Sequence, residues 1–549
     1  MSNISRKSFL QKTSATALTI APSSILGKSH KNMAEKRFRN TMITTFLLVA
    51  PCLYAANNKK PNVLLIYTDD HRYSGVHALG GEDVQTPNLD KLANSGVVFE
   101  NAHLMGAFSG ATSVPSRAML ITGRNLFQID GVGHFVPPTH TTIGEAFQQA
   151  GYHAHHVGKW HQDHATLSRS YNSGGKVSGT VAYLTDQFRM PFCEWNDKGK
   201  LSKKDFYLLE YDEKGNVVKR PLSEKDKRGP IGTEKTGPHV SEVLADDAIH
   251  FIKDYDDKKP FFMYLAIPCP HDPRQSPEAF RKQYPPEKVK LPPSFMTQHP
   301  FDNGHIVLRD EELAPWPRTI DIAKQHLGDY YAIITHMDAQ IGRVIEELKR
   351  SGQYENTIII MAGDSGLAVG NHGLIGKQNV YSEDGTHIPF ILSGGAIDNA
   401  LRGKREDALC YVHDIMPTIC DAAGIDIPKS ASGKSLMPVL KGEKESINDC
   451  TYHAYLQFQR AYRKGDYKLI EYVRAKGFDK QRGEYTAGSR VTQLFNLKKD
   501  RWECFDLSAF PEHAERIQTM RKEMKKKAMQ LGDYADGKRT SYDFWQYYD

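Results

Sequence analysis

The stretch Lys60-Pro61-Asn62-Val63-Leu64-Leu65-Ile66-Tyr67-Thr68-Asp69-Asp70 holds an unbroken apolar run that ends in two adjacent carboxylates. A short continuous apolar run without polar alternation is typical of a strand that is buried on both faces, as in a parallel sheet covered by helices. Similar runs stand at residues 261–267 (FFMYLAI) and 357–361 (TIIIM). The three runs therefore predict central strands of one α/β sheet.

Helix-like segments alternate with these runs from Pro61 to about Leu440, which predicts a large, mostly parallel sheet sandwiched by helices. Residues 86–96 and 142–151 each begin with a threonine N-cap and end in glycine, and residues 321–350 carry a long apolar stripe of period 3.6. Residues 168–179 are polar and irregular, which predicts a loop whose flexible point is Ser173-Gly174-Gly175.

The N-terminal 56 residues have the composition of an export signal. A basic group, Lys36-Arg37-Phe38-Arg39, precedes an apolar stretch over residues 42–56 with a plausible cleavage point near Ala55. Residues 5–10 (SRKSFL) are similar to a twin-arginine signal with one arginine replaced by lysine. Either translation starts later, for example at Met33, or two signals are joined. Residues 1–56 are therefore expected to be removed, and the protein to be periplasmic or secreted.

Composition narrows the class of partner. The chain has 549 residues, 40% of them hydrophobic, and a formal net charge of only +6. Since it holds no low-complexity basic tract, nucleic-acid binding is not expected, and Lys525 to Lys527 are interpreted as a solvated helix face. No internal stretch reaches the ~20 apolar residues of a membrane span. Six of the seven cysteines lie beyond the signal without C-x-x-C spacing, and their pairing stays open.

A second motif lies at residues 113–124, SVPSRAMLITGR, which reads S-x-P-S-R-x-x-L-x-T-G-R. It resembles the segment in which type I sulfatases, of the alkaline phosphatase superfamily, oxidise a Ser or Cys at the first position to formylglycine. The resemblance implies that Ser113 becomes this aldehyde, whose hydrate attacks sulfur and later expels sulfate. Pro115 is expected to start a helix over residues 116–122, with Arg117 in its first turn holding the hydrate.

Three carboxylates form the candidate metal site. Asp69 and Asp70 end the first strand, and Asp364 follows the run at residues 357–361. Adjacent carboxylates repel each other unless a cation is bound, and hard oxygen ligands suit Ca²⁺ or Mg²⁺. The resemblance implies one Ca²⁺ held by these three, by the modified Ser113 and by Ser365. The family more often has Asn or His where this chain has Ser365. Because a serine hydroxyl is a weak ligand, whether Ser365 binds the metal stays open.

The remaining site residues come from three further segments that resemble family motifs. Residues 151–161 (GYHAHHVGKWH) match a second sulfatase signature, which implies that Lys159 holds the sulfate and His161 contacts the formylglycine. The step Pro270-His271-Asp272-Pro273 makes His271 the acid that protonates the leaving oxygen. Gly376-Lys377 implies that Lys377 bridges sulfate and leaving group. A metal, two lysines and an arginine would stabilise the developing negative charge.

The resemblance covers about residues 60–515 and implies a catalytic α/β domain over 57–440. It also implies a small C-terminal subdomain over 441–549, with an antiparallel sheet against a helix. Two alternatives stay open. One is a phosphate or phosphonate ester hydrolase, disfavoured because lysines stand where a second metal would bind. The other is a catalytically silent carbohydrate-binding homologue in which Ser113 is unmodified.

The substrate is inferred from general features of the chain. Export, a modest basic excess and long loop-like insertions favour a sulfated carbohydrate, such as a fragment of an algal or animal polysaccharide, over a small aryl or lipid sulfate. Because the precursor is Ser113, the expected maturation partner is a radical iron–sulfur enzyme of the Ser-accepting kind.

Overall fold

The computed structural model describes residues 59–179, 186–223, 226, 236–474, 477–479, 484–486, 488–533 and 544–548. The predicted export signal over residues 1–56 lies outside the described residues. Among the described helices, none combines the length and apolar character that crossing a bilayer demands.

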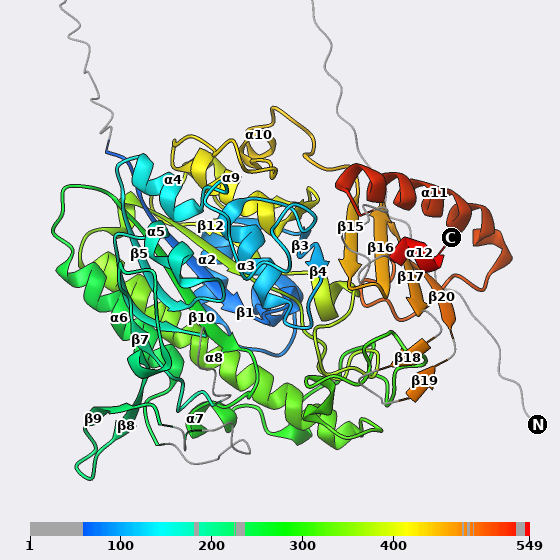
Figure 1. Ribbon diagram of the computed structural model, residues 1–549, viewed down its shortest axis with the longest axis horizontal. Coiled ribbons are helices and arrows are strands. Elements are labelled where there is room, and N and C mark those ends of the chain that lie inside the picture. Colours follow the sequence, from blue (N-terminus) through cyan, green and yellow to red (C-terminus); the bar gives the residue numbers. More distant parts are fainter. Residues whose placement is uncertain are drawn as a thin grey trace, which may run out of the picture. The chain divides into compact units, whose positions relative to one another are not determined.

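A large, mostly parallel sheet forms the centre of the described chain (Figure 1). Its strand order is β13-β2-β12-β11-β1-β10-β5-β6-β7. Only the pairs β11–β12, β12–β2 and β6–β7 are antiparallel. The strands are β1 (Asn62–Asp69), β2 (Val97–Phe99), β5 (His153–Lys159), β6 (Ser173–Ser178), β7 (Cys193–Glu194), β10 (Phe261–Pro270), β11 (Thr357–Gly363), β12 (Phe390–Ser393) and β13 (Arg405–Glu406). The three apolar runs of the sequence form the strands β11, β1 and β10, as predicted, and the structure shows that these strands are neighbours.

Helices cover both faces of this sheet because alternate residues of each central strand point to opposite sides. Leu64 and Ile66 pack with the apolar faces of α2 (Pro87–Ser95), α6 (Val240–Asp254) and α8 (Ile320–Arg350). Val63 and Leu65 pack on the other side with α3 (Ser113–Thr122), α4 (Ile143–Gln149) and α9 (Val412–Ala422). The shorter helices are α1 (His77–Gly80), α5 (His164–Ser170), α7 (Glu278–Arg281) and α10 (Met437–Leu440). The predicted layered α/β class is confirmed.

Two local predictions were wrong. The helix expected over residues 116–122 begins at Ser113, so Arg117 lies beyond its first turn. Pro115 is its third residue, where the missing N–H removes no helical bond because N–H groups of the first turn have no acceptor within the helix. The loop expected at residues 168–179 instead completes α5 and forms β6, which pairs in parallel with β5.

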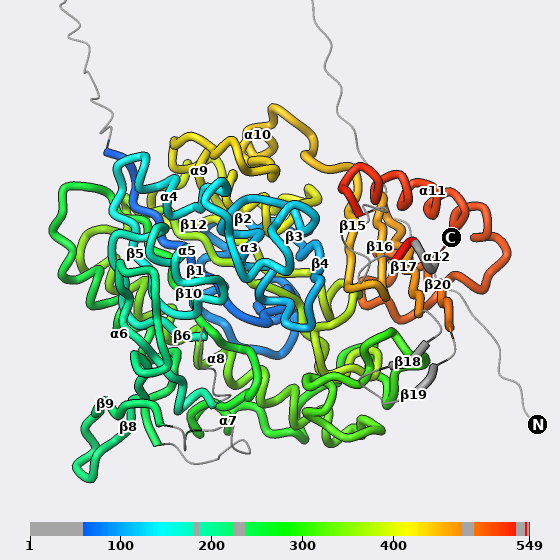
Figure 2. The backbone as a smooth tube through the Cα atoms, viewed as in Figure 1, coloured from blue at the N-terminus to red at the C-terminus, as the bar shows by residue number. Residues whose placement is uncertain are grey.

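A five-stranded sheet, largely antiparallel, lies in the C-terminal part of the chain, in the order β20-β17-β16-β15-β4. Its strands are β4 (Gly106–Ala107), β15 (Thr451–Tyr455), β16 (Gln459–Lys464), β17 (Tyr467–Arg474) and β20 (Ser489–Asn496). The helix α11 (Ala514–Leu531) packs on it, and α12 (Phe544–Tyr548) contacts β17. The edge strand β4 comes from before Ser113 and lies beside β15 (Figure 2). The sheet is therefore tied to the chain that leads into α3.

Small two-stranded sheets complete the described fold. They pair β3 (Ala102–His103) with β14 (Cys410–Tyr411), β8 (Tyr207–Tyr211) with β9 (Val217–Pro221), and β18 (Gly477–Asp479) with β19 (Glu484–Thr486).

Candidate active site

The predicted site residues meet at one edge of the large sheet. The parallel neighbours β11, β1, β10 and β5 all end there. Asp69 closes β1, Lys159 closes β5, His271 directly follows β10, and Asp364 directly follows β11. Because the carboxyl ends of parallel strands share one edge, residues distant in sequence converge in space.

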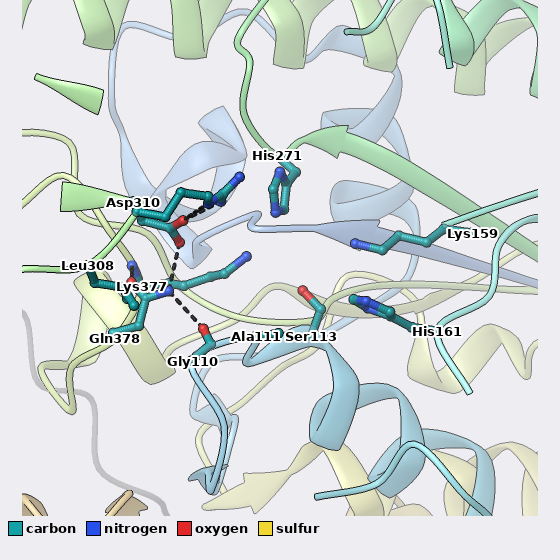
Figure 3. A pocket seen from close by; sticks show the side chains of 11 residues that line it. Gly110, Ala111, Ser113, Lys159, His161, His271, Leu308, Asp310, Lys377 and Gln378 are labelled. Carbon is teal, nitrogen blue, oxygen red and sulfur yellow. Dashed lines mark hydrogen bonds and ion pairs between the residues drawn. The ribbon is translucent and has the colours of Figure 1, made fainter. Parts of the chain in front are cut away.

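Ser113 lies in the middle of this group, at the first residue of α3. It is 2% exposed, and its Oγ donates a hydrogen bond of 2.7 Å to Asp69 Oδ1. Figure 3 shows the Ser113 side chain with Lys159 and His161 on one side and Lys377 on the other. These residues and His271 line a cavity of about 350 Å³. The hydroxyl therefore faces the space where a substrate would enter.

The three acidic residues form one buried cluster. Asp69, Asp70 and Asp364 are each at most 1% exposed. The backbone N–H of Asp70 donates to Asp364 Oδ1 at 2.8 Å, and Asp70 has a φ of 60°, which is uncommon for a residue other than glycine. Burial, together with the neighbouring carboxylate of Asp69, raises the pKa of Asp364 well above its usual range. Such a cluster is stabilised by added positive charge.

Three basic side chains supply that charge. Lys159 forms an ion pair with Asp69, and Lys377 Nζ lies 2.5 Å from Asp70 Oδ1. The guanidinium of Arg117 lies 3.5 Å from Asp364 Oδ2 and 3.7 Å from Asp69 Oδ2. Burial favours a lower pKa for Lys377, but the carboxylates of Asp70 and Asp69 outweigh it and raise the pKa. Lys377 therefore stays charged at neutral pH.

The two histidines have different surroundings. His271 Nδ1 donates to the backbone carbonyl of Asp272 at 2.7 Å, since a carbonyl oxygen only accepts. Its Nε2 lies 3.8 Å from Asp70 Oδ2 and faces the cavity. Burial and the adjacent Lys159 charge lower the pKa of His161 well below its usual range. His161 is therefore neutral at pH 7.

Comparison with known proteins decides the family. The model of the family described as Sulfatase matches residues 61–425, which is most of the chain. The chain belongs to the sulfatase family. A second model, described as the C-terminal part of N-sulphoglucosamine sulphohydrolase, matches residues 370–530. The predicted membership and sulfatase activity are confirmed.

Similar proteins span nearly the same length as this sulfatase. An arylsulfatase from Clostridium perfringens is 28% identical, over 84% of this chain and 93% of the relative. An N-acetylglucosamine-6-O-sulfatase from Bacteroides thetaiotaomicron is 25% identical, over 84% of this chain and 83% of the relative. A solved structure in complex with its substrate D-glucosamine-2-N,6-O-disulfate has a TM-score of 0.64 and 21% identity, covering 88% of this chain and all of the other. At that identity the structure shows a shared fold.

The acidic cluster of the sulfatase fits a hard divalent cation. Asp69, Asp70 and His271 offer ligand atoms that all lie within 4.8 Å of one another. His271 was expected as an acid and not as a member of such a group. Ser365 Oγ donates to Asp70 Oδ1 at 3.1 Å, so its hydroxyl lies at the cluster, and its part as a ligand stays a prediction. Carboxylate oxygens favour Ca²⁺ or Mg²⁺ over softer metals.

Sequence reasoning missed part of the cavity wall. Leu308, Arg309 and Asp310 line it from the segment before α8, together with Gln378. The Arg309 guanidinium contacts Asp272 Oδ1 at 2.9 Å, and Gln378 Nε2 donates to Asp310 Oδ2 at 2.7 Å. This segment has no helical or strand periodicity. Its only signal was the group of charges at residues 309–312 directly after apolar residues 306–308.

Proposed function

We propose that this sulfatase hydrolyses sulfate esters of a carbohydrate through a formylglycine made from Ser113. The observation that carries the proposal is the placement of Ser113. Its hydroxyl lies 2.7 Å from Asp69 at the start of α3 and faces a cavity that Lys159, His161, His271 and Lys377 also line. An anion that enters this cavity meets positive charge on two sides.

Each residue has a separate part in this proposal. The formylglycine would supply the attacking hydroxyl, and Asp69, Asp70 and Asp364 would hold one Ca²⁺ that would neutralise sulfate oxygens. Lys159 and Lys377 stabilise the charge that develops on the sulfate and on the leaving oxygen. Arg117 is held by Tyr264 Oη at 3.1 Å and keeps the carboxylates in place.

The histidines divide the proton transfers. His271 Nε2 faces the cavity while its Nδ1 is fixed on a backbone carbonyl, so Nε2 is the atom that would give a proton to the departing alcohol oxygen. His161 lies beside Lys159 and has a lowered pKa, so it is neutral and ready to accept a proton. It would take the proton that is lost when sulfate is expelled from residue 113.

The carbohydrate class is supported by similarity and by the chain's own features. The Bacteroides relative is described as an N-acetylglucosamine-6-O-sulfatase. The export-like N-terminus and the modest net charge of +6 point the same way, toward an exported enzyme that acts on a sulfated polysaccharide or its fragments. Maturation of Ser113 would need a Ser-type radical maturating enzyme in the same host.

Two alternatives to this function are tested by the assay described below. A phosphate or phosphonate ester hydrolase of the two-metal kind would need extra His and Asp ligands, whereas in this structure Lys159 pairs with Asp69 and Lys377 with Asp70. A silent carbohydrate-binding protein would leave Ser113 unmodified.

The test compares the parent with Ser113→Ala after production with a Ser-type maturase. Sulfated hexosamines, algal oligosaccharides, an aryl sulfate, a phosphate monoester and a phosphonate serve as substrates. We expect sulfate release by the parent alone, with Ser113→Ala below about a thousandth of its rate and folded by thermal unfolding. Phosphate release exceeding sulfate release, or full sulfate release by Ser113→Ala, would refute the proposal.

A further inference from the structure

Residues 377–382, the segment that begins with Lys377, are bound by the C-terminal sheet on the side away from the catalytic cavity. Four polar side chains of that region bind four of the five residues that follow Lys377. Gln459 Nε2, on β16, donates to the backbone carbonyl of Gln378 at 3.3 Å. Lys468 Nζ, on β17, donates to the carbonyl of Val380 at 2.7 Å.

The other two contacts fix the next two positions. Tyr381 Oη donates to Gln493 Oε1, on β20, at 2.7 Å. The backbone N–H of Ser382 donates to Glu503 Oε2 at 2.5 Å. Each of the residues 378, 380, 381 and 382 is therefore bound by a different side chain from a region far along the chain.

Glu503 is the centre of this arrangement. Its carboxylate is an ion-pair partner of Lys468 Nζ at 2.7 Å, and its backbone carbonyl accepts from His372 Nε2 at 3.0 Å. His372 in turn stacks on Tyr381 at 3.9 Å and bonds Asp384 Oδ2 at 2.5 Å. Both Glu503 and His372 have positive φ, at 54° and 50°, a conformation that persists where the surroundings hold it.

The opposite side of the segment meets the catalytic cavity. Gln378 Nε2 donates to the carbonyl of Gly110 at 2.9 Å and to Asp310, while Lys377 Nζ reaches Asp70 at 2.5 Å. The residues between Lys377 and Ser382 form neither helix nor strand. Because no regular structure sets their backbone, side-chain contacts such as these help to set the position of Lys377.

We propose that Gln459, Lys468, Gln493 and Glu503 are positioning residues that hold Lys377 against Asp70, so that the C-terminal sheet is part of the catalytic unit. The inference rests on the proposed function in one respect, namely that Lys377 acts on the substrate. None of the four is among the residues that line the cavity.

The matched pair of variants is Glu503→Gln and Glu471→Gln. Both glutamates are 2% exposed and belong to the C-terminal region, but Glu471 binds Arg521 Nε at 2.6 Å and Thr492 and does not contact residues 376–387. Each variant replaces a buried carboxylate that pairs with a basic side chain, which is the buried Lys468 in one case and the partly exposed Arg521 in the other. If both variants lose exchange protection or activity, the cause is a less stable C-terminal sheet. If only Glu503→Gln loses them, the cause is the altered position of residues 377–382.

The first measurement is amide hydrogen exchange over residues 376–387 in the full chain, which needs no substrate. We expect exchange to become about tenfold faster in Glu503→Gln and to change less than about twofold in Glu471→Gln. Equal exchange in the two variants would overturn the proposal. Since no activity enters this measurement, its failure is distinct from failure of the proposed function, which would appear as absence of sulfate release by the parent.

The second measurement is a double-mutant cycle on kcat/KM for sulfate release by matured protein. We expect Glu503→Gln to lower kcat/KM about tenfold and Lys377→Ala about a hundredfold. In the Lys377→Ala background, Glu503→Gln should then cost less than about twofold, because its effect passes through Lys377. Losses that multiply would overturn the proposal. If Glu503→Gln does not fold, Tyr381→Phe, which removes only the hydroxyl that binds Gln493, is judged by the same cycle.

Discussion

Single residues decide which proton transfers the cavity supports. His271 and His161 both line it, but one is fixed through Nδ1 on a backbone carbonyl and the other lies beside Lys159 with a lowered pKa. A sugar alkoxide needs a proton as it leaves, whereas an activated phenolate leaves unaided. The two histidines are therefore separable by the choice of leaving group.

The first prediction compares a sugar sulfate with an activated aryl sulfate. His271→Ala should lower kcat/KM for the sugar sulfate by about a hundredfold or more and for the aryl sulfate by less than about tenfold. His161→Ala should slow both substrates equally, since expulsion of sulfate from residue 113 is common to them. Steady-state kinetics on matured protein measure both. Equal losses for His271→Ala would place the acid elsewhere, with Lys377 as the next candidate.

Secondary-structure elements differ in how far their sequences determine them. β1, β10 and β11 were predictable because each is a continuous apolar run. α2 was predictable from the proline at its first residue and α4 from its capping box, and both of these signals are local. In contrast, β6 begins Ser173-Gly174-Gly175, which has no strand propensity, and it is held by pairing with β5 and by packing near Trp195. That stabilisation comes from tertiary contacts, which local patterns do not record.

The same distinction applies to the site. Residues at strand ends, such as Asp69 and Lys159, were predictable because strand order and family motifs place them. Leu308 to Asp310 were not, because their position depends on tertiary contacts such as that of Arg309 with Asp272. The contacts of the C-terminal sheet with residues 378–382 were hidden for the same reason.

At the element scale, the N-cap of α4 provides a stability prediction. Thr142 Oγ1 accepts from the N–H of Glu145 at 3.3 Å, and Glu145 Oε2 accepts from the N–H of Thr142 at 2.8 Å. Thr142→Ala should lower the free energy of unfolding by about 1 to 2 kcal/mol. Denaturant unfolding measures it. Thr141→Ala, one residue before the cap, is the control and should change it by less than about 0.5 kcal/mol; equal effects would show that the cap contributes nothing.

At the scale of the whole molecule, the buried cluster of Asp69, Asp70 and Asp364 links stability to activity. A cation bound there should raise both the free energy of unfolding and the rate of sulfate release. Asp69 ends β1, and Asp70 and Asp364 directly follow β1 and β11, two strands that pair with each other in the sheet. Repulsion among the three carboxylates opposes folding unless it is neutralised. Binding to the folded state alone adds about 2.7 kcal/mol at a hundredfold excess over Kd.

The corresponding prediction concerns removal of the metal. Dialysis against a chelator should lower both the thermal unfolding midpoint and sulfate release, and Ca²⁺ should restore both. Elemental analysis of active protein should find one Ca²⁺ per chain. Two metals per chain, or zinc, would instead favour the phosphate or phosphonate hydrolase.

The central claim is that Ser113 becomes the nucleophile, and the mass of the peptide that carries it tests this most directly. In active protein produced with a Ser-type maturase, we expect the tryptic peptide that contains Ser113 to have lost two hydrogens, as conversion of the hydroxyl to an aldehyde requires. The converted fraction should rise in proportion to sulfate release across preparations. Full sulfate release from protein whose Ser113 peptide has the unmodified mass would contradict the account.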